Sequence, residues 1–410
     1  MNTPHRPPRV LTFSTLFPNA AQPAWGIFVE TRLRHLVASG RIASRVVAPV
    51  PWFPSRNPRF GRYAGFASAP RSERRFGATV DHPRFLTLPK VGMTIAPALL
   101  ALGAAGELRR LRAGGFDFDL IDAHYYYPDG VAAALLGQWF NRPVVITARG
   151  TDVNLLPRYG RIRRMIRWAS ERAAASIAVC QALKDEMIAI GMDGERIQVL
   201  RNGVDLSAFA PLDQREARRR LGFGEGPLAL SVGYLIERKG HHFAIEALRE
   251  LLDWRLVIVG SGEMESELRS LADRCGVTSR VHFAGEVSQH ALRDYYCAAD
   301  LLVLASSREG MANVLLESLA CGTPVVATAL WGTPEVIAAP EAGVLMKARS
   351  TPALVEAVRR LAANRPSRER TRAYAGQFGW DRTTAGQLEL FSRILSDRGG
   401  VAARPQAGRA

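Results

Sequence analysis

The sequence of 410 residues has few cysteines and no long apolar run. Its four cysteines are scattered, without a Cys-x-x-Cys pair or a histidine at ligand spacing, so a disulfide framework and a zinc site are both disfavoured. The longest apolar stretch, residues 91–106, is interrupted by Pro97 and falls short of the roughly 18 residues that predict a membrane-spanning helix. The first residues also lack the apolar core of a signal peptide. We therefore expect a cytoplasmic protein without a membrane span.

Acidic residues are scarce relative to basic ones, with 38 Asp and Glu against 54 Lys and Arg and a net charge of +16. The excess is concentrated in residues 1–200, which hold 27 basic and 14 acidic side chains, whereas residues 201–410 hold 27 and 24. Such a surplus favours an anionic partner, which is nucleic acid, an anionic membrane surface or a phosphorylated substrate. Nucleic acid is disfavoured because no recognition-helix motif and no stacking platform of aromatic and basic residues is evident.

Short β-branched runs alternate with helical patterns along the chain. We expect strands at residues 9–14, 44–48, 120–123, 144–147, 176–179 and 197–201, and a second series at residues 228–233, 255–259, 281–284, 301–305, 324–327 and 343–345. This alternation of nearly continuous apolar strands with helices predicts the α/β class with parallel, doubly wound sheets. Residues 52–90, rich in Pro, Arg and aromatic residues, are interpreted as a long irregular insertion.

Two strand series predict two similar domains. The expected division is an N-terminal Rossmann-like domain over residues 1–205, a linker over 206–226, a C-terminal Rossmann-like domain over 227–375, a C-terminal helix over 376–397 that packs back on the first domain, and a disordered tail over 398–410. Ligands of open parallel sheets lie at the carboxyl ends of the strands, so the cleft between two such domains is the default active site.

The richest loop of this kind follows the expected strand at residues 301–305. Glu309 lies in the loop and Glu317 lies inside the helix that comes next, where both carboxylates would accept hydrogen bonds from sugar or ribose hydroxyls. The free amides of Met311, Ala312 and Asn313 would favour an anion at the helix start. The alternative is a surface helix with solvated glutamates.

A second candidate loop follows the expected strand at residues 228–233. Gly233 ends that strand, and Arg238 and Lys239 precede a helix, where a lysine is well placed to hold a diphosphate. The same three residue types also occur in ordinary exposed turns. After the next strand, Gly260 and Gly262 suggest a nicotinamide dinucleotide fingerprint, but the third glycine is missing.

The chain as a whole resembles the family 4 glycosyltransferases. EGMANVLLESLACGTPVVAT (309–328) is similar to the Glu-x7-Glu signature of that family, and RNGVDLSAFAP (201–211) is similar to its interdomain junction. The motifs WGTPEVI, GIFVETRLRHL, IDAHYYYPDG and ITARGTDVN extend the resemblance over about residues 9–395. It implies the GT-B fold, in which two Rossmann-like domains face each other across a cleft. It also implies retaining transfer of a hexose from a nucleoside-diphosphate sugar, with no obligatory metal and no cofactor. The finer similarity is to bacterial enzymes of exopolysaccharide, teichuronic acid or lipopolysaccharide synthesis.

The resemblance also implies roles for single residues. Lys239 and Arg238 would stabilise the diphosphate and Glu309 would contact the donor sugar, which makes these three the expected catalytic residues. Glu317 would bind the ribose hydroxyls. The further donor-binding positions that it implies are Gly233, Gly285 near the base, and the amides of Gly310, Met311, Ala312 and Asn313. Gly26 would let the backbone approach the phosphate and the acceptor.

The sequence departs from the family at two positions. Tyr234 stands where many members have Arg, so a second phosphate cation is missing there unless Arg238 replaces it. Arg149 stands where many members have His, and an arginine stays protonated near neutral pH and cannot act as a general base. Arg149 would then act electrostatically, or it would form a purely structural pair with Asp152. His124 either lines the acceptor side or is a structural hydrogen-bonding residue.

The sequence also leaves other functions open. A metal-dependent GT-A transferase would use Asp117 and Asp119, but this pair precedes a strand rather than following one. An inactive nucleotide-sugar-binding or membrane-associated accessory protein of the same fold is the main alternative. The expected partners are a nucleoside-diphosphate sugar, a saccharide acceptor that is free or lipid-linked, and an anionic membrane surface, but not nucleic acid. Residues 158–172 predict either a surface-lying amphipathic helix on the inner membrane face or a core-facing helix with a solvated basic face.

Overall fold

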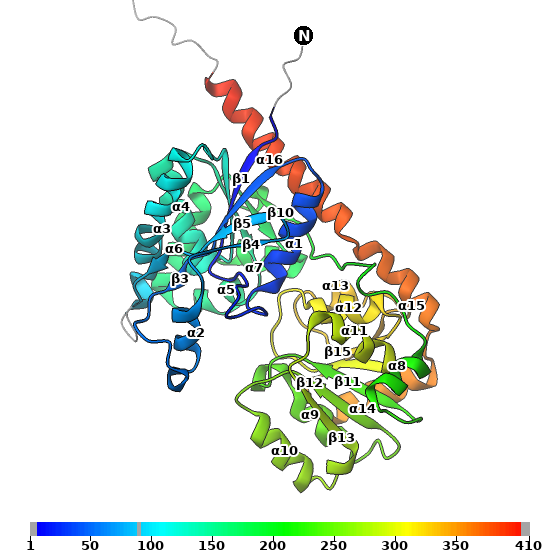
Figure 1. Ribbon diagram of the computed structural model, residues 1–410. Helices are drawn as coiled ribbons and strands as arrows, with labels where there is room; N and C mark the ends of the chain where they lie inside the picture. The colour runs from blue at the N-terminus through cyan, green and yellow to red at the C-terminus, as the bar shows by residue number, and fades with distance from the viewer. Residues whose placement is uncertain (1–5, 88–91, 403–410) are drawn as a thin grey trace, which may run out of the picture. The chain divides into compact units, whose positions relative to one another are not determined.

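The structure is a computed structural model that describes residues 6–87 and 92–402. The chain divides into two compact units (Figure 1). The first unit contains the chain up to Arg201 together with the residues from Asp381 onward, and the second unit contains Asn202–Trp380. Each unit is built on a mainly parallel sheet with helices on both faces. This confirms the α/β class and the two Rossmann-like domains predicted from the sequence.

The first unit contains the largest sheet, in the order β10-β9-β8-β7-β1-β2-β5-β4. Its strands are β1 (Arg9–Phe13), β2 (Ala43–Val47), β3 (Val50–Pro51), β4 (Ser72–Arg75), β5 (Ala78–Asp81), β6 (Arg84–Phe85), β7 (Leu120–His124), β8 (Val144–Ala148), β9 (Ala175–Ala178) and β10 (Ile197–Val199). Its helices are α1 (Ile27–Ala38), α2 (Arg62–Ser68), α3 (Ala96–Ala113), α4 (Val131–Phe140), α5 (Thr151–Asn154), α6 (Gly160–Arg172), α7 (Gln181–Ala189) and α16 (Trp380–Ala402), with short turns η1 (Pro58–Phe60), η2 (Gly92–Thr94), η3 (Tyr126–Gly130), η4 (Leu156–Arg158) and η5 (Gly194–Arg196).

The second unit has a sheet in the order β13-β12-β11-β14-β15-β16, and every printed pairing in it is parallel. Its strands are β11 (Leu228–Val232), β12 (Arg255–Val259), β13 (Val281–Gly285), β14 (Leu301–Leu304), β15 (Val325–Thr328) and β16 (Gly343–Met346). Its helices are α8 (Gln214–Leu221), α9 (His241–Ala247), α10 (Glu265–Arg274), α11 (Gln289–Ala298), α12 (Asn313–Ala320), α13 (Thr333–Val336), α14 (Thr351–Ala363) and α15 (Arg368–Ala375), with short turns η6 (Glu237–Lys239), η7 (Thr278–Arg280) and η8 (Gly376–Phe378).

Both sheets reverse their strand order at one place, and such a switch point is where open α/β sheets bind ligands. In the first sheet the order reverses between β1 and β7, and in the second it reverses between β11 and β14. The loop after β1 ends at Gly26, and His124 is the last residue of β7. The loops after β11 and β14 carry Lys239 and Glu309. The topology therefore places four of the predicted site residues at the two switch points.

Residues 52–90 are not the irregular insertion that the sequence suggested. Within the described part of this segment, β5 pairs in parallel with β2 and β4 pairs antiparallel with β5, so the segment extends the first sheet. Ala78 and Val80 point into the core and are buried. The strands escaped recognition because each is four residues long and because β4, with the sequence SERR, has no apolar side chain.

The predicted linker over residues 206–226 is also wrong. This stretch belongs to the second unit, and it contains α8, whose Gln214 and Arg218 side chains bond to Asp300 at the start of β14. The buried ion pair anchors α8 to the sheet, which explains how a charged sequence forms an ordered element.

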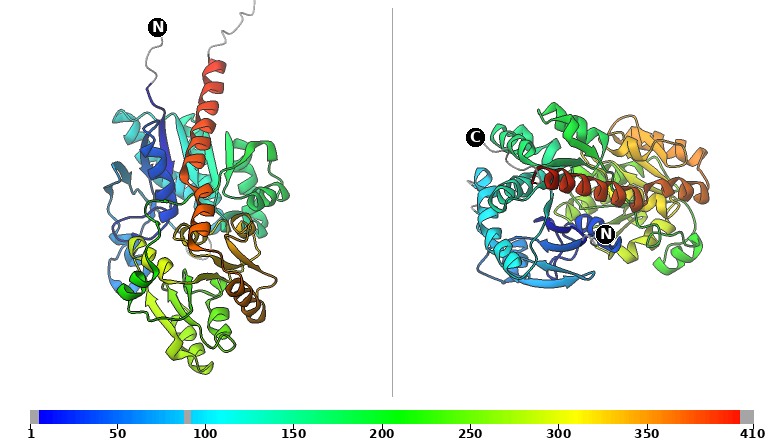
Figure 2. Two further views of the ribbon diagram at one scale, coloured as in Figure 1. Left: turned by 90° about the vertical axis from the view of Figure 1, so that its right-hand side faces the viewer. Right: turned by 90° about the horizontal axis from the view of Figure 1, so that it is seen from above.

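The last helix, α16, lies along the first unit (Figures 1 and 2). Leu388, Leu390 and Phe391 are buried in the core cluster of that unit. α16 extends to Ala402, so the predicted tail over residues 398–410 begins inside a helix, and its remainder, residues 403–410, lies outside the described residues. Among the helices of the described chain, none combines the length and the apolar composition that a membrane crossing requires.

Candidate active site

Three predicted site residues meet at the switch point of the second sheet. The Nζ atom of Lys239 lies 2.7 Å from Oε1 of Glu309, and a guanidinium nitrogen of Arg238 lies 3.1 Å from the same oxygen. Lys239 and Arg238 come from η6, after β11, whereas Glu309 comes from the loop after β14. We call these three residues the charged cluster. Parallel strands that lie side by side bring the two loops together although they are 70 residues apart in the chain.

The charged cluster carries two positive charges and one negative charge. Burial acts to raise the pKa of Glu309, but the positive charges of Lys239 and Arg238 outweigh burial and hold this pKa below its ordinary value. Glu309 is therefore ionised at neutral pH. A surplus positive charge remains, and it favours an anion beside the cluster.

Glycines allow the loops around Lys239 to lie close together. Gly233 has a φ of +148°, and a side chain at this position would lie within 3.3–3.6 Å of the Lys239 side chain. A side chain at Gly260 would meet the carbonyl oxygen of Gly233 at 2.0 Å, and one at Gly262 would meet the backbone of Leu235. Loop packing thus explains why glycine stands at positions 260 and 262, and the two glycines no longer need a nicotinamide dinucleotide to explain them.

Arg349 is a residue of this region that the sequence did not indicate. Its guanidinium donates to the carbonyl oxygen of Ala305 at 2.9 Å, and to both the carboxylate and the carbonyl oxygen of Glu237 at 2.8 Å. It also lies over the ring of Phe243, 5.0 Å from its centre. Arg349 joins the end of β14 to η6 and so fixes the turn that carries Lys239. It lies about 40 residues from Glu309 in a plain loop, and no motif marks it.

Glu317 lies on α12, the helix that follows the loop carrying Glu309. Its Oε2 atom accepts a hydrogen bond of 2.8 Å from the hydroxyl group of Tyr296, which is buried on α11. Burial raises the pKa of Glu317 to about 7 despite this hydrogen bond. The start of α12 is held by Asn202, whose amide donates to Oδ1 of Asn313 at 2.9 Å. Tyr296 and Asn202 support the predicted site and were not identified from the sequence.

The remaining donor-side positions lie around these groups. Gly285 ends β13 with a φ of +69°, and its carbonyl oxygen accepts a hydrogen bond from the amide of Gly260 at 2.8 Å. The space beside Gly285 that a side chain would occupy is open. Gly310 accepts from the amide of Gly332 at 3.1 Å, and Met311 and Ala312 are buried in front of α12.

In the first unit, His124 and Arg149 meet at the ends of β7 and β8. Nδ1 of His124 lies 2.8 Å from a guanidinium nitrogen of Arg149, and Nε2 lies 3.3 Å from Oδ2 of Asp122. Because a guanidinium only donates, Nδ1 must accept and Nε2 must carry the proton. Burial lowers the pKa of His124, so the ring is neutral. His124 thus holds Arg149 in place, and both its nitrogens are occupied.

A chain of buried polar groups continues from Asp122 to the last helix. Oδ2 of Asp122 accepts 2.8 Å from the amide nitrogen of Gln387, and the Gln387 oxygen accepts 2.9 Å from Nε of Arg32. Arg32, Asp122, His124 and Gln387 are each at most 2% exposed. Burial, together with the nearby charge of Arg32, lowers the pKa of Arg149 to about 9, which still leaves Arg149 charged at neutral pH.

Comparison with known proteins identifies the family. Residues 63–208 match the family described as Glycosyltransferase Family 4, and residues 213–378 match the one described as Glycosyl transferases group 1. TuaC of Bacillus subtilis strain 168, named as a glycosyltransferase of teichuronic acid biosynthesis, is 32% identical over 360 residues, which cover 86% of this chain and 88% of TuaC. The chain belongs to the family 4 glycosyltransferases.

Solved structures agree with this membership at the level of the fold. The sucrose-phosphate synthase of Thermosynechococcus elongatus superposes with a TM-score of 0.78 at 21% identity, covering 96% of this chain and all of that one. Anabaena Alr3699/HepE in complex with UDP-glucose superposes with a TM-score of 0.71 at 21% identity, again covering 96% of this chain and all of that one. The predicted GT-B fold is confirmed.

The glycine that ends the first loop of this glycosyltransferase has a packing reason. Gly26 has a φ of +69°, and a side chain there would lie 2.3 Å from the carbonyl group of Leu16 and 2.8 Å from the amide of Phe17. The contacts with Leu16 and Phe17 give this position a packing reason to be glycine. The role that the resemblance implies for Gly26, close approach of the backbone to phosphate and acceptor, stays a prediction.

The carboxylate of Asp152 binds the turn that carries Arg149. Its carboxylate accepts hydrogen bonds from the backbone amides of Tyr126, Arg149 and Gly150, at distances of 2.7–3.2 Å. Asp152 is fully buried. It therefore ties the loop after β8 to the loop after β7 and orients the backbone of Arg149, which is the structural role that the sequence left open.

The two aspartates that a GT-A reading would use are bonded to arginines and backbone. Asp119 accepts from the amide of Arg9 at 2.8 Å and from the Arg6 side chain, and Asp117 pairs with Arg112 and Arg142. In the part of the chain that the structure describes, no three His, Cys, Asp or Glu side chains gather as metal ligands would.

The interpretation of residues 158–172 is decided by burial. In α6, Ile162 and Ile166 are buried against the first unit, whereas Arg161, Arg164 and Arg167 are exposed. α6 is thus a core-facing helix with a solvated basic face. Its apolar side is not available for insertion into a bilayer.

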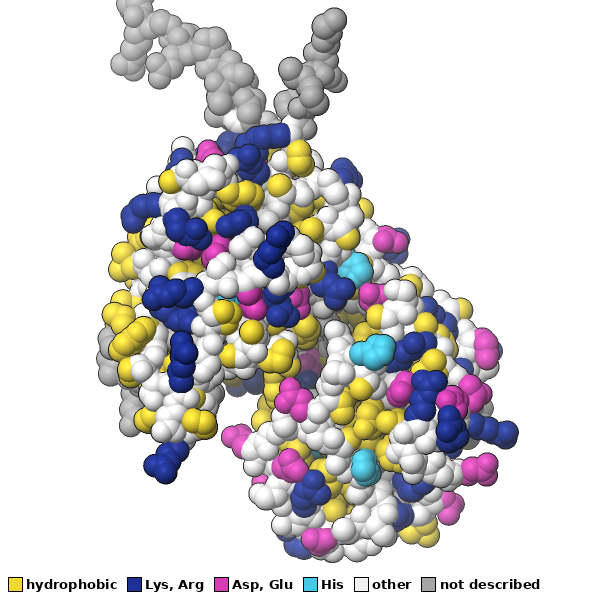
Figure 3. Space-filling view, viewed as in Figure 1, with side chains coloured by type: hydrophobic (Ala, Val, Ile, Leu, Met, Phe, Trp, Pro, Cys, Tyr) yellow, Lys and Arg dark blue, Asp and Glu magenta, His cyan; other side chains and the backbone are white. Residues whose placement is uncertain are grey.

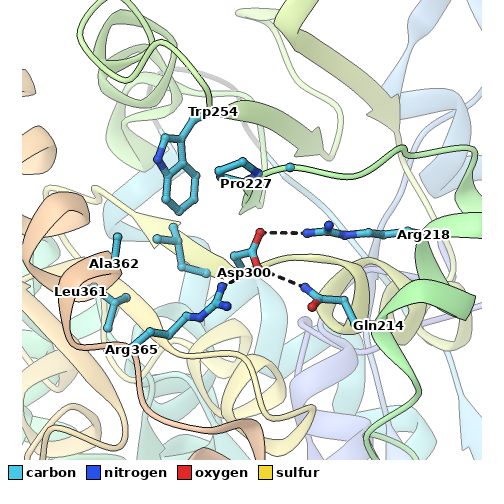
Figure 4. Close-up of a pocket in the computed structure, with 10 residues that line it drawn as sticks. Gln214, Arg218, Pro227, Trp254, Asp300, Leu361, Ala362 and Arg365 are labelled. Atoms are coloured by element: carbon cyan, nitrogen blue, oxygen red, sulfur yellow. Dashed lines mark hydrogen bonds and ion pairs between the residues drawn. The ribbon is translucent and has the colours of Figure 1, made fainter.

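A pocket of about 430 Å³ in the second unit lies away from the charged cluster (Figure 4). Its lining residues Pro227, Trp254 and Asp300 precede β11, β12 and β14, so the pocket lies at the amino ends of the strands. The Asp300 carboxylate accepts from Arg218, Arg365 and other donors around it, which anchor α8 and the end of α14. Asp300 and the arginines around it therefore have a structural role in this pocket, which is to hold α8 and the end of α14 against the sheet.

Proposed function

We propose that this glycosyltransferase moves a hexose, with retention at the anomeric carbon, from a nucleoside-diphosphate sugar to a saccharide acceptor of cell-surface polysaccharide synthesis. The acceptor is lipid-linked, and the protein acts in the cytoplasm on the inner face of the membrane, without a metal. The observation that carries the proposal is the charged cluster of Lys239, Arg238 and Glu309 at the switch point of the second sheet. Alr3699/HepE, which shares the fold, binds UDP-glucose.

The charged cluster suits the departure of a diphosphate. As the bond from the anomeric carbon to the phosphate oxygen breaks, the electron pair stays on the diphosphate and positive charge develops on the sugar. Lys239 and Arg238 would stabilise the leaving diphosphate, and the ionised Glu309 would face the cationic sugar. Removing one such preorganised donor lowers the rate by about 100-fold or more.

Retention follows if the acceptor hydroxyl attacks from the side that the diphosphate leaves. The hydroxyl oxygen then bonds to the anomeric carbon, and its proton passes to the departing phosphate oxygen, so no protein base is required. This agrees with Arg149, which stays protonated, and with His124, whose two nitrogens are engaged. In the proposal, Arg149 acts as a fixed positive charge and Glu317 accepts hydrogen bonds from the ribose.

Two observations support the proposed acceptor and location. The name of TuaC assigns it to teichuronic acid biosynthesis, which is a polysaccharide pathway. The net charge of +13 in residues 1–200 would draw the first domain to an anionic surface or a phosphorylated acceptor.

The proposal is tested by binding and turnover of nucleoside-diphosphate sugars. Calorimetry with a panel of such sugars should identify a donor, and Lys239→Ala should weaken its binding. Lys239→Ala and Glu309→Ala should each lower transfer by about 100-fold or more because each removes a group that acts on the leaving diphosphate or the sugar. Lys347→Ala is the matched control, since Lys347 forms an exposed ion pair with Glu356 and should not change either measurement.

Full transfer by either variant would disprove the site. Donor binding without any turnover on saccharide or lipid-linked acceptors would favour the alternative, an accessory protein that binds nucleotide sugars.

A further inference from the structure

An aromatic and basic segment projects from the first unit after β3. Residues 51–72 contain five aromatic residues and four arginines but no acidic residue. The segment forms η1 and α2, and Figure 3 shows hydrophobic and basic side chains side by side over the projection that carries them. The composition of this stretch predicts an irregular insertion and shows no evident platform of aromatic and basic residues.

Four of the aromatic side chains form a continuous row, which we call the aromatic ridge (Phe53, Phe60, Tyr63 and Phe66). The ring centres of Phe53 and Phe60 are 5.3 Å apart, those of Phe53 and Tyr63 are 5.3 Å apart, and those of Tyr63 and Phe66 are 6.0 Å apart. Phe60 is 49% exposed and Tyr63 is 37% exposed. Rings held by one another at such exposure offer a rigid apolar surface to a ligand.

The ridge leads into an apolar pocket of about 110 Å³ beside the loop after β1. Phe66 belongs to both, and Trp25 and Phe85 form further walls of the pocket. The indole nitrogen of Trp25 donates to the carbonyl oxygen of Thr15 at 3.0 Å, which fixes the ring. The hydroxyl group of Thr15 and the carboxamide groups of Asn19 and Gln22 are the polar groups of the lining. A fixed aromatic face with amides at its edge is a chemistry that suits a sugar ring.

Three arginines lie around the same segment, and we call them the arginine cluster (Arg56, Arg71 and Arg84). The amide of His82 donates to the carbonyl oxygen of Arg71 at 2.8 Å, which places Arg71 beside the segment that carries Arg84. Burial, followed by the positive charges of Arg71 and Arg56, lowers the pKa of Arg84. Arg84 donates to backbone carbonyl oxygens of His82 and Ala69.

The nearest acidic residues do not neutralise this cluster. Glu73 bonds to His82 and Arg75, and Asp81 bonds to Arg45 and Arg110. In the part of the chain that the structure describes, no Asp or Glu carboxylate lies within 4.0 Å of a guanidinium nitrogen of the arginine cluster. Positive charge concentrated in this way favours a ligand with more than one negative charge.

We propose that the pocket, the arginine cluster and the aromatic ridge bind an acceptor that is a saccharide carried on a polyprenyl diphosphate. The first sugar lies against Trp25, the diphosphate lies at the arginine cluster, and the prenyl chain lies on the ridge. This inference rests on the proposed function and deepens it by assigning the acceptor its chemical class. A bare anionic bilayer does not account for a pocket with a fixed aromatic wall, and a nucleic acid does not account for rings that pack against one another.

The experiment is a calorimetric titration of the full chain with farnesyl diphosphate and, separately, with inorganic diphosphate. It is carried out in a Lys239→Ala background, so that the donor site does not compete for diphosphate. Farnesyl diphosphate should bind at least tenfold more tightly than inorganic diphosphate. Phe60→Ser with Tyr63→Ser should remove that difference and leave the affinity for inorganic diphosphate unchanged, which also shows that the variant is folded.

Charge variants complete the test. Arg56→Gln with Arg71→Gln should weaken both ligands at least tenfold. The matched control is Arg161→Gln with Arg164→Gln on the exposed face of α6, which removes the same charge and should change neither affinity. Equal binding of the two diphosphates, or equal losses in the control, would overturn the proposal.

Competition separates the other anionic partners. Phosphatidylglycerol vesicles or a single-stranded oligonucleotide that bind through the ridge, while farnesyl diphosphate does not, would also overturn the proposal. The titration involves no donor sugar, so a protein without transferase activity could still pass it. Conversely, a failed titration would leave transfer to a lipid-free acceptor intact, and the two hypotheses are therefore tested separately.

Discussion

Among single residues, Glu317 makes the stability of the protein depend on pH. Burial raises its pKa to about 7 from an ordinary value of 4.5. Between these two pH values the folded protein keeps a proton that the unfolded chain releases, so this stabilising contribution is present at low pH and is lost as the pH rises through about 7. Glu317→Gln, which mimics the protonated form, should therefore stabilise the protein more at pH 8 than at pH 5, as measured by chemical denaturation.

Glu356 is a suitable comparison because its pKa is shifted in the opposite direction, below the ordinary value. It is exposed and bonds to Lys347, whose hydrogen bond and charge lower the pKa of Glu356. Glu356→Gln should therefore give no stabilisation at pH 8 relative to pH 5. If Glu317→Gln behaves like Glu356→Gln, the Glu317 carboxyl group is not desolvated as described here.

At the scale of elements, the turn η6 depends on Arg349. Arg349→Ala removes hydrogen bonds to Ala305 and Glu237. The part-buried bond to the Ala305 carbonyl group contributes about 1.5–3 kcal/mol, whereas the exposed pair with the Glu237 carboxylate contributes about 0–1 kcal/mol. Lys239 should then be held less firmly, and the affinity for a nucleoside-diphosphate sugar should fall by about tenfold in calorimetry. Arg349→Lys should not restore it, because a lysine lacks the planar fork that reaches both partners.

Arg359→Ala is the control for this turn. Arg359 is also an arginine of the second unit, but it pairs with Glu250 at the surface. Its replacement should leave the affinity for the nucleotide sugar unchanged. Unchanged affinity in Arg349→Ala as well would mean that η6 holds its shape without Arg349.

The elements also show what the sequence reveals and what it hides. The strands of the second sheet and all strands of the first sheet except β4 and β5 are predictable to within one or two residues, because continuous apolar runs mark buried parallel strands. The charged cluster was found for a related reason, since ligand-binding loops follow strand ends. By contrast, β4 is polar and forms because it pairs with β5 at the sheet edge. The local sequence of β4 does not predict this pairing with β5.

The supporting residues were hidden by distance along the chain. Gln387 bonds to Arg32 across 355 positions and to Asp122 across 265, and nothing in the local sequence of any of the three points to the others. The same holds for Tyr296 beneath Glu317. The residues proposed to touch a ligand lie in motifs, whereas the residues that hold them in place come from distant parts of the chain that the fold brings together.

For the whole molecule, the order of the chain and the division into units differ. α16 follows the second unit in sequence, but Phe391 and its neighbours complete the core of the first unit. Replacing a buried Phe by Ala costs about 3–5 kcal/mol, and this cost falls on the unit whose core is damaged. Phe391→Ala should therefore loosen residues near the start of the chain rather than those that precede α16 directly.

Hydrogen exchange resolves the two units by peptide. Phe391→Ala should speed exchange in β1, β7 and β8 of the first unit and leave β11 and β14 unchanged. Leu354→Ala, at a buried position of the second core, should do the reverse. If Phe391→Ala instead speeds exchange in β11 and β14, then α16 belongs energetically to the unit that it follows. Leu388, Leu390 and Phe391 fill a core whose other buried members lie before Arg201. We therefore expect the first unit to complete its folding only after α16 has been synthesised.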